Sequence, residues 1–204
     1  MIRRGRLIAL EGGEGSGKST QARLLADRLD AVLTREPGGT DLGEAIRSLV
    51  LLGPDHVDPR AEALLMAAAR AQHVAEVIRP ALEAGQHVVT DRFTPSSLAY
   101  QGFGRGLGAG EIAELSHWAT AGIAADLVVF LEVADEVRLE RRGAPRDRME
   151  AAGEAFHQRV IAGFRELAAM EENRWEVVAG EGEVSEVAER IWAAWERSLA
   201  GVAR

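Results

Sequence analysis

Short apolar runs and longer amphipathic segments alternate along the chain. The apolar runs show little of the polar alternation expected of a strand with one wet face, and they resemble strands that are buried on both faces. They lie at residues 7–10, 31–33, 87–90, 127–131 and 175–178. This pattern predicts a five-stranded parallel β-sheet.

Between these runs, apolar residues return every three or four positions, which is the spacing of a helix with one buried face. In the last segment they are Val184, Val187, Ala188, Ile191, Trp192 and Trp195. Helices are predicted over residues 19–29, 42–52, 60–84, 110–121, 137–142, 150–172 and 184–195. Buried runs that alternate with helices indicate an α/β fold of three layers, with helices on both faces of the sheet.

Two irregular stretches interrupt this order. Five glycines between residues 102 and 110 predict a flexible loop between helices, and the charged residues 143–148 predict a lid within about residues 138–149. Neither stretch has the composition of a long linker. The 204 residues are therefore expected to form one domain, residues 1–204.

Composition and charge narrow the classes of function. The net charge of −8 argues against binding of nucleic acid, because such proteins usually carry a clustered positive excess. Without cysteine the chain has no disulfide framework or thiolate metal site, which suits the cytoplasm. No apolar stretch is long enough for the core of an export signal or for a membrane span, so we expect no membrane partner.

A single lysine, Lys18, stands among 24 basic residues, and it lies in the octet Gly-Gly-Glu-Gly-Ser-Gly-Lys-Ser at residues 12–19. The octet matches the phosphate-binding loop G-x-x-x-x-G-K-[ST], with a predicted strand before it and a predicted helix after it. In such a loop, backbone N–H groups and the lysine hold phosphate oxygens, while the hydroxyl of Ser19 ligates Mg²⁺. The expected triphosphate-binding residues are Gly12, Gly13, Glu14, Gly15, Ser16, Gly17, Lys18, Ser19 and Thr20.

Asp91 and Arg92 come directly after the apolar run 87–90. The carboxyl ends of parallel strands face the ligand crevice of an α/β sheet, so these residues are placed to meet Mg²⁺ and phosphate. Taken alone, Asp91 and Arg92 are explained equally well as an ion pair that only caps the strand. We expect Asp91 to join Ser19 in holding the metal.

Arginines from four segments follow or border elements expected at the same edge of the sheet: Arg35, Arg47, Arg70 and Arg92. Together they suit a second phosphoryl group, because guanidinium groups bind phosphate with two parallel hydrogen bonds. Each one alone is more simply a surface charge. A GTPase needs an Asn-Lys-x-Asp motif, but the one asparagine, Asn173, is followed by Arg174. A small kinase is the simplest remaining function for the loop.

Further stretches are arranged in a specific order. They are Arg-Glu-Pro-Gly-Gly-Thr at 35–40, Ala-Ala-Arg at 68–70, Asp-Arg-Phe at 91–93, Ser-Ser-Leu-Ala-Tyr-Gln-Gly at 96–102, and Asp-Arg-Met-Glu at 147–150. With Glu14, Phe156 and Arg159, they make nearly the whole chain resemble a bacterial thymidylate kinase. The resemblance implies a P-loop NTPase fold with a short arginine-bearing lid. It also implies Mg²⁺-dependent transfer of the ATP γ-phosphoryl group to thymidine 5′-monophosphate (dTMP), for synthesis of dTTP.

The same resemblance implies roles for single residues. Arg92 would hold the acceptor phosphate, with Arg35 and Arg47 completing the clamp. Arg70 and Ser97 would bond the edge of thymine. The full set implied for the acceptor site is Arg35, Glu36, Pro37, Arg47, Met66, Arg70, Arg92, Ser97, Tyr100 and Gln101, in which Tyr100 disfavours a ribose 2′-hydroxyl and Gln101 supports that wall.

Two positions differ from the family pattern. Met66 stands where a phenylalanine usually stacks on thymine, and a thioether can still pack against the ring. Gly15 stands where one branch of the family has a catalytic arginine. The negative charge on the phosphoryl group during transfer would then be stabilised by an arginine of the segment that starts at Arg138 and Arg141. The catalytic candidates in that segment are Arg142, Arg146 and Arg148.

Two alternatives stay open. Another nucleoside or deoxynucleoside monophosphate kinase would share most of these motifs. The departure from the family pattern at Met66 is compatible with such an enzyme. A nucleotide-binding sensor without turnover would also keep the loop, although Lys18 and Arg92 argue against it. The family resemblance also implies a homodimer, through the apolar faces of the helices predicted over residues 60–84 and 110–121.

Overall fold

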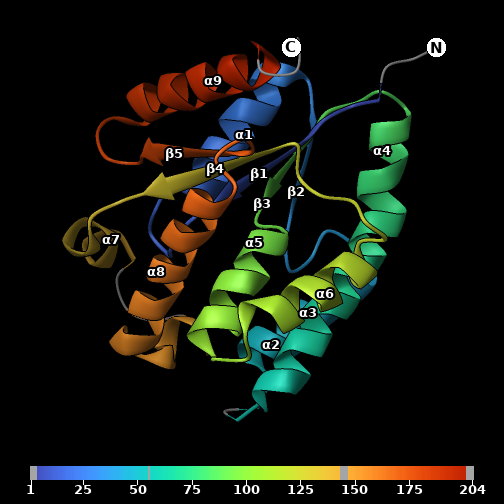
Figure 1. Ribbon diagram of the computed structural model, residues 1–204, viewed down its shortest axis with the longest axis vertical. Helices are drawn as coiled ribbons and strands as arrows, with labels where there is room; N and C mark the ends of the chain where they lie inside the picture. Colours follow the sequence, from blue (N-terminus) through green and yellow to red (C-terminus); the bar gives the residue numbers. More distant parts are fainter. Residues whose placement is uncertain (1–3, 55, 143–146, 201–204) are drawn as a thin grey trace.

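The computed structural model describes residues 4–54, 56–142 and 147–200, except for the side chains of Leu139 and Arg142. Its centre is an all-parallel sheet with the strand order β2-β3-β1-β4-β5 (Figure 1). The strands are β1 (Leu7–Glu11), β2 (Val32–Arg35), β3 (Val88–Asp91), β4 (Leu127–Glu132) and β5 (Trp175–Ala179). Each predicted run overlaps one strand, so the five-stranded parallel sheet is confirmed.

Strand β1 lies at the middle of the sheet and is buried along its whole length. Its side chains alternate between two apolar cores, with Leu7 and Ala9 on one face and Ile8 and Leu10 on the other. The strands that follow it in sequence lie on opposite sides of it: β2 and β3 on one side, β4 and β5 on the other. The carboxyl end of β1 is therefore the point where an α/β sheet of this kind opens a ligand crevice.

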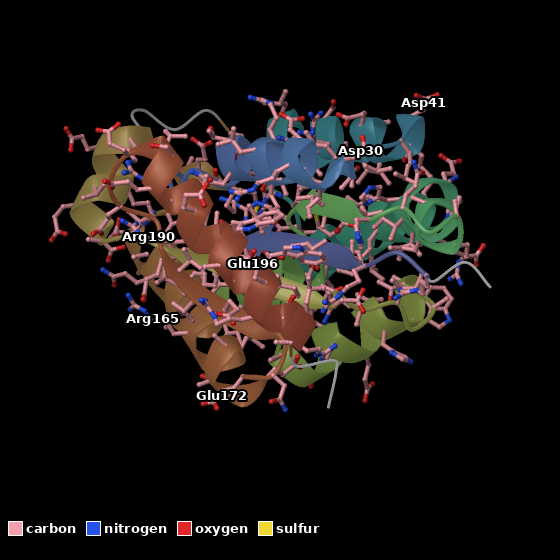
Figure 2. The ribbon with its side chains drawn as sticks, turned by 90° about the horizontal axis from the view of Figure 1, so that it is seen from above. Asp30, Asp41, Arg165, Glu172, Arg190 and Glu196 are labelled. Carbon is pink, nitrogen blue, oxygen red and sulfur yellow. The ribbon has the colours of Figure 1, made fainter. Side chains whose placement is uncertain are left out.

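Helices cover both faces, as predicted (Figure 1). Helices α1 (Lys18–Leu29) and α9 (Val184–Ala200) pack on the face of Ile8 and Leu10. Figure 2 shows Arg190 and Glu196 of α9 on the solvent side. The other face and the flank carry α2 (Asp41–Leu52), α3 (Pro59–His73), α4 (Arg79–Glu83), α5 (Thr94–Ser97), α6 (Ala109–Ala119) and α8 (Glu154–Met170).

Two predicted helices are interrupted. The segment predicted over 60–84 consists of α3, a π-helical turn η1 (Val74–Ile78) and α4, which has Pro80 in its first turn. Proline has no backbone N–H, and it fits the first turn of a helix but not its interior. The segment predicted over 150–172 breaks at Gly153, whose φ of 89° separates the 3₁₀ turn η3 (Glu150–Ala152) from α8.

The flexible loop predicted over 102–110 is wrong in its first part. Residues Leu98–Gly104 form a π-helical segment, η2, that packs against α8. A Cβ atom on Gly104 would lie 2.7 Å from the Phe156 ring and 2.9 Å from Val160. Glycine is needed here for close packing of two helices, and it does not mark a flexible chain.

Beyond β4, helix α7 (Asp135–Arg142) contains the start of the segment predicted as a lid, about residues 138–149. Residues 143–146, in the middle of the predicted lid, lie outside the described residues. The chain returns at Asp147 and packs Met149 into the core. In the part of the chain that the structure describes, no helix is both long and apolar enough to span a membrane.

Candidate active site

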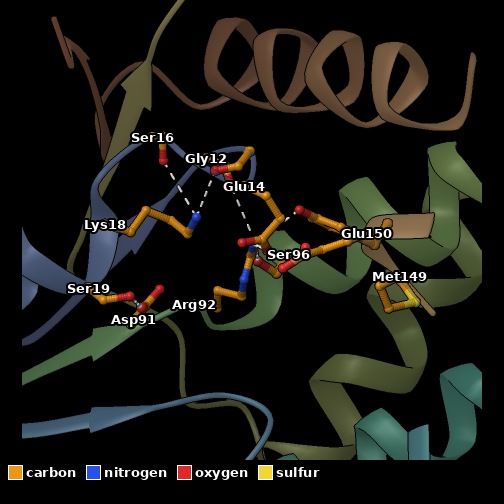
Figure 3. A network of polar contacts seen from close by, with 12 residues as sticks. Gly12, Glu14, Ser16, Lys18, Ser19, Asp91, Arg92, Ser96, Met149 and Glu150 are labelled. Carbon is orange, nitrogen blue, oxygen red and sulfur yellow. Dashed lines mark hydrogen bonds and ion pairs between the residues drawn. The ribbon is translucent and has the colours of Figure 1, made fainter. Parts of the chain in front are cut away.

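The phosphate loop connects β1 to α1 at the carboxyl edge of the sheet. Gly17 precedes α1 with a φ of 89°, a left-handed conformation that glycine adopts without steric cost. The buried Lys18 turns back over the loop, where its Nζ donates to the Gly13 carbonyl at 2.8 Å and to Ser16 Oγ at 3.5 Å (Figure 3). Burial, with a smaller contribution from Arg92, lowers the pKa of Lys18. An anion in the loop would offset both effects.

Ser19 and Asp91 fit a magnesium ion. The Ser19 hydroxyl donates to Asp91 Oδ2, while Asp91 Oδ1 is buried and accepts no hydrogen bond from the described residues (Figure 3). Hydroxyl and carboxylate oxygens are ligands that Mg²⁺ prefers, and the ion is often held by one or two such groups together with substrate phosphates. Among the described residues, no group of three or more His, Asp or Glu side chains is arranged around a metal site. The donor set therefore suits a metal that arrives with a nucleotide.

Arg92 links the phosphate loop to the neighbouring pocket. Its φ is 76°, a left-handed backbone conformation that is uncommon for a residue with a Cβ atom. Its Nη1 donates to Gly12 O at 3.3 Å and to Ser96 Oγ at 3.0 Å, and its Nη2 donates to Glu14 and, at 3.0 Å, to Tyr100 Oη (Figure 3). One guanidinium thus contacts residues of the phosphate loop and residues that follow β3.

The acid and the phenol around Arg92 titrate abnormally. The charge of Arg92 lowers the pKa of Glu14 to about 2 even though burial opposes the shift. Burial raises the pKa of Tyr100 to about 12 against the opposing charge of Arg92. At neutral pH, Glu14 is therefore a carboxylate and Tyr100 is a phenol that accepts from Arg92.

Glu11 is a buried acid beside the site that the sequence analysis did not single out. It ends the buried strand β1, and its carboxylate accepts from Phe93 N at 2.8 Å and from Ser96 Oγ at 2.6 Å. Burial raises the pKa of Glu11 to about 7, although Arg92 and both hydrogen bonds lower it. The available signal was an acid that directly continues an apolar run, because a buried acid needs partners.

The predicted acceptor residues surround one pocket beside the phosphate loop. Its lining residues are Glu14, Glu36, Pro37, Arg47, Leu51, Met66, Arg70, Arg92, Ser96, Ser97, Tyr100, Gln101, Asp147, Met149 and Glu150. Of the ten residues predicted for the acceptor site, all except Arg35 line it. Arg35 lines a second cleft, which runs from Lys18 and Ser19 over the strand ends and shares Glu14, Glu36, Arg47 and Arg92 with the pocket.

The inner wall of the pocket is a buried network around Arg70. Arg70 donates from Nε to Glu36 at 2.7 Å, from Nη1 to Ser97 Oγ at 3.0 Å, and from Nη2 to the Phe93 carbonyl at 3.1 Å. The buried His73 bonds the other oxygen of Glu36 through Nδ1 at 2.9 Å. These contacts hold the Arg70 guanidinium in one plane at the pocket surface.

The two arginines predicted to complete the phosphate clamp have different surroundings. Arg47 donates from Nη1 to the Pro37 carbonyl at 2.9 Å and lines both cavities. Arg35 is more than half exposed and pairs with Glu44 at 2.9 Å. Arg47 is the better placed of the two to meet an anion inside the pocket.

The lid arginines are also distributed unevenly. Arg148 donates to Glu62 of α3 at 2.8 Å and to the Val50 carbonyl of α2 at 3.0 Å, so it bonds two helices next to the pocket. Arg146 and the side chain of Arg142 lie outside the described residues. The buried Arg138 packs against the phosphate loop: a Cβ atom on Gly13 would lie 2.9 Å from Arg138 Cδ. Its Nη1 has no hydrogen-bond partner in the described part of the chain.

Comparison with known proteins adds to this geometry. The sequence model of the thymidylate kinase family matches residues 10–191. A thymidylate kinase of Synechococcus sp. (strain JA-2-3B'a(2-13)) is 51% identical over 94% of this chain and 95% of its own length. One from Leifsonia xyli subsp. xyli is also 51% identical, over 93% of each chain. The crystal structure of thymidylate kinase from Ehrlichia chaffeensis has a TM-score of 0.79 and 30% identity, covering 95% of this chain and 99% of that chain.

Proposed function

The chain belongs to the thymidylate kinase family, and from this premise we propose that its phosphate loop binds ATP while the adjoining pocket binds dTMP. The protein is a kinase that phosphorylates dTMP to the diphosphate, as expected from the sequence. The observation that best supports the two-site assignment is Arg92, which contacts Glu14 of the loop and Tyr100 of the pocket at the same time. An arginine in this position lies where a donor and an acceptor phosphate would meet.

The chemistry asks the protein for alignment and charge neutralisation, because an oxygen of the acceptor phosphate is the nucleophile. Lys18 would leave its contact with Gly13 to bind the β and γ phosphates. Arg92 and Arg47 would hold the acceptor phosphate in line with the γ-phosphorus. Ser19 and Asp91 would hold Mg²⁺, which neutralises phosphate charge when it is bound.

We assign stabilisation of the transferring phosphoryl group to an arginine of the lid segment. Arg142 and Arg146 remain candidates from the sequence, and Arg138 joins them because its side chain packs against Gly13 of the loop and its buried Nη1 has no partner in the described part. Alanine at each position in turn separates the candidates. The active arginine is expected to lower kcat by about 10³-fold, whereas a residue with only a surface role leaves kcat unchanged. Arg148, the third candidate from the sequence, is replaced in the same way, although its bond to Glu62 favours a structural role.

A panel of acceptors tests the function itself. Purified protein, ATP and Mg²⁺ are incubated with dTMP, dUMP, dCMP, dGMP and UMP in separate reactions, and formation of ADP is measured. Preference for dTMP supports the proposal. Preference for a purine acceptor would favour a different nucleotide kinase, and no ADP with any acceptor would favour a nucleotide-binding sensor.

We also propose that the enzyme works in the cytoplasm as a homodimer. Helices α3 and α6 lie side by side, and each carries a large apolar side chain in solvent: Leu64 is 59% exposed and Trp118 is 80% exposed. Burial of these two side chains against a second copy would remove apolar area from water. Sedimentation should show a dimer for the wild type and a monomer for Trp118→Glu; a wild-type monomer would contradict the proposal.

A further inference from the structure

A second buried carboxylate, Glu62 of α3, lies behind the pocket wall. Its side chain is completely buried, and three segments donate to it. Gln101 Nε2 donates to Oε1 at 2.9 Å, and Arg105 donates to both oxygens at 3.2 and 3.1 Å. Arg148 of the lid segment donates to Oε2 at 2.8 Å. Glu62 thus joins η2, the turn after it and the lid to one helix.

Glu62 is ionised at neutral pH. Burial by itself opposes ionisation, but the hydrogen bonds from Arg105, Gln101 and Arg148 outweigh it, and the pKa of Glu62 lies below its ordinary value. An ionised carboxylate accepts hydrogen bonds and donates none. Every group that faces it must therefore present an N–H.

This requirement fixes the orientation of the Gln101 amide. A glutamine side chain has a donor end and an acceptor end of nearly the same shape, and its neighbours decide which end faces which way. Because Nε2 must face Glu62, Oε1 is directed away from it. Gln101 is buried in the pocket wall and its Nε2 is used by Glu62, so Oε1 is the end of the amide that remains for the pocket. The pocket therefore receives an acceptor from Gln101.

Another lining residue, Arg70, supplies donors to the same pocket. Arg70 has five N–H groups and uses three in the contacts with Glu36, Ser97 and Phe93. A donor beside an acceptor complements the C=O and N–H of an imide, the edge shared by thymine and uracil. Cytosine presents an amino group and an unprotonated ring nitrogen instead, so it would face both groups with the wrong polarity.

We propose that Glu62 is a positioning residue for base selection: by holding the Gln101 amide in one orientation, it makes the pocket accept imide pyrimidines and reject cytosine. The inference rests on the proposed function, since it assigns the base to this pocket. It goes further by giving a residue that lies outside the pocket a role in specificity.

The substitution Glu62→Gln tests this with little change in volume. Oε2 accepts from Arg105 Nη2 and Arg148, whereas Oε1 accepts from Gln101 and, at 3.2 Å, from Arg105 Nε. The oxygen of the new amide is therefore expected to take the Oε2 position, with its nitrogen facing Gln101 and the Arg105 Nε bond lost. Gln101 is then expected to rotate, presenting its oxygen to residue 62 and its NH₂ to the pocket. The ratio of kcat/KM for dTMP to that for dCMP should fall by at least about tenfold, because a misplaced polar group at a base edge is strongly discriminating.

Two further variants separate positioning from stability. Arg105→Met removes one partner of Glu62 but leaves its bond to Gln101, so it is expected to lower Tm and to keep the selectivity ratio of the wild type. Glu62→Gln combined with Gln101→Glu restores a donor facing an acceptor, with a carboxylate oxygen again in the pocket. This double variant should regain preference for dTMP.

The outcomes are distinct. A folded Glu62→Gln variant with the wild-type ratio overturns the inference, and so does a double variant that prefers dCMP. If Glu62→Gln does not fold, the double variant decides alone. Failure of the proposed function has another signature: wild-type protein would then form no ADP with dTMP.

Discussion

The phosphate loop and the acceptor pocket satisfy their polar groups in different ways. In the loop, Lys18 bonds Gly13 and Ser16, five and two residues away in sequence. In the pocket, Arg70 bonds Glu36 and Ser97, 34 and 27 residues away, and behind its wall Arg148 bonds Glu62, 86 residues away. The loop is a local structure, whereas the pocket exists only when distant elements have packed together.

This difference has consequences for binding. Lys18 makes contacts that it can exchange for phosphate oxygens without disturbing the core. The buried bonds of Arg70 and Gln101 hold those side chains in place before a base arrives, so little ordering entropy remains to be lost on binding. We therefore expect changes at the loop to act mainly on kcat and changes at the pocket wall to act mainly on KM for dTMP or on stability.

The largest expected effect is at Lys18. Lys18→Ala removes the charge that stabilises the transferred phosphoryl group, and kcat should fall by about 10³-fold with KM for dTMP little changed. Lys18→Arg keeps the charge but replaces a compact ammonium with a planar fork, and it should also be impaired. Steady-state kinetics with both substrates varied measures this. Full activity of Lys18→Arg would show that a point charge is not required.

Glu11 joins the two regions, and its titration gives a test by pH. Its folded-state pKa of about 7 lies above the ordinary 4.5, so between these values the folded chain binds more protons than the unfolded chain. Glu11 should therefore lower stability as pH rises through this window. Glutamine keeps an acceptor without the charge, so Glu11→Gln should gain about 2–3 kcal/mol relative to wild type between pH 4.5 and 8.

Denaturant unfolding of both proteins across this pH range checks the prediction. If the free energy of unfolding changed with pH in the same way for wild type and Glu11→Gln, Glu11 would not be titrating in the folded state in this range.

Arg70→Lys tests whether the pocket wall acts on acceptor binding alone. An ammonium cannot reproduce the three separate bonds of the guanidinium, and the buried Glu36 would lose its bond from Arg70 Nε and keep only the contact with His73. KM for dTMP should rise by about 10- to 100-fold, consistent with loss of hydrogen bonds to charged groups. KM for ATP should stay unchanged, and a parallel rise in both constants would mean that the two regions are not separable.

The smallest expected effect is at Met66, which lines the pocket and packs against Ile46, Val50 and Ala69. Met66→Phe offers a flat ring to the base and should lower KM for dTMP by about two- to tenfold, the worth of an aromatic contact. Met66→Leu serves as a control of similar volume without aromatic character. An unchanged KM in the phenylalanine variant would mean that residue 66 does not contact the base.

Most of the fold could be predicted from the sequence because its signals are local. Buried strands such as β1 are continuous apolar runs, and helices such as α9 repeat their apolar residues at helical spacing. The glycines of 102–110 were misinterpreted because glycine serves two purposes. Gly104 allows α8 to approach closely, and only the position of Phe156 reveals this.

The parts of the site that could be predicted are those whose residues stand close together in the sequence or match a family motif. The phosphate loop is a contiguous motif, and the family resemblance identified pocket residues such as Arg70 and Ser97. Glu11 and Glu62 were missed because an acid inside a predicted strand or helix has no visible partner in the sequence. Their partners, Ser96 and Gln101, lie 85 and 39 residues away and are brought close only by the fold.

The left-handed backbone at Arg92 imposes a constraint of a different kind, on how this turn can change. A residue with a Cβ atom is disfavoured there by roughly 1–2 kcal/mol, which glycine would relieve. Yet glycine has no guanidinium to join the loop to the pocket. The backbone and the chemistry thus prefer different residues at the same position. Glycine at position 92 would relax the backbone but leave Glu14, Ser96 and Tyr100 without their guanidinium partner, so the arginine is held in this turn by its contacts and against its backbone preference.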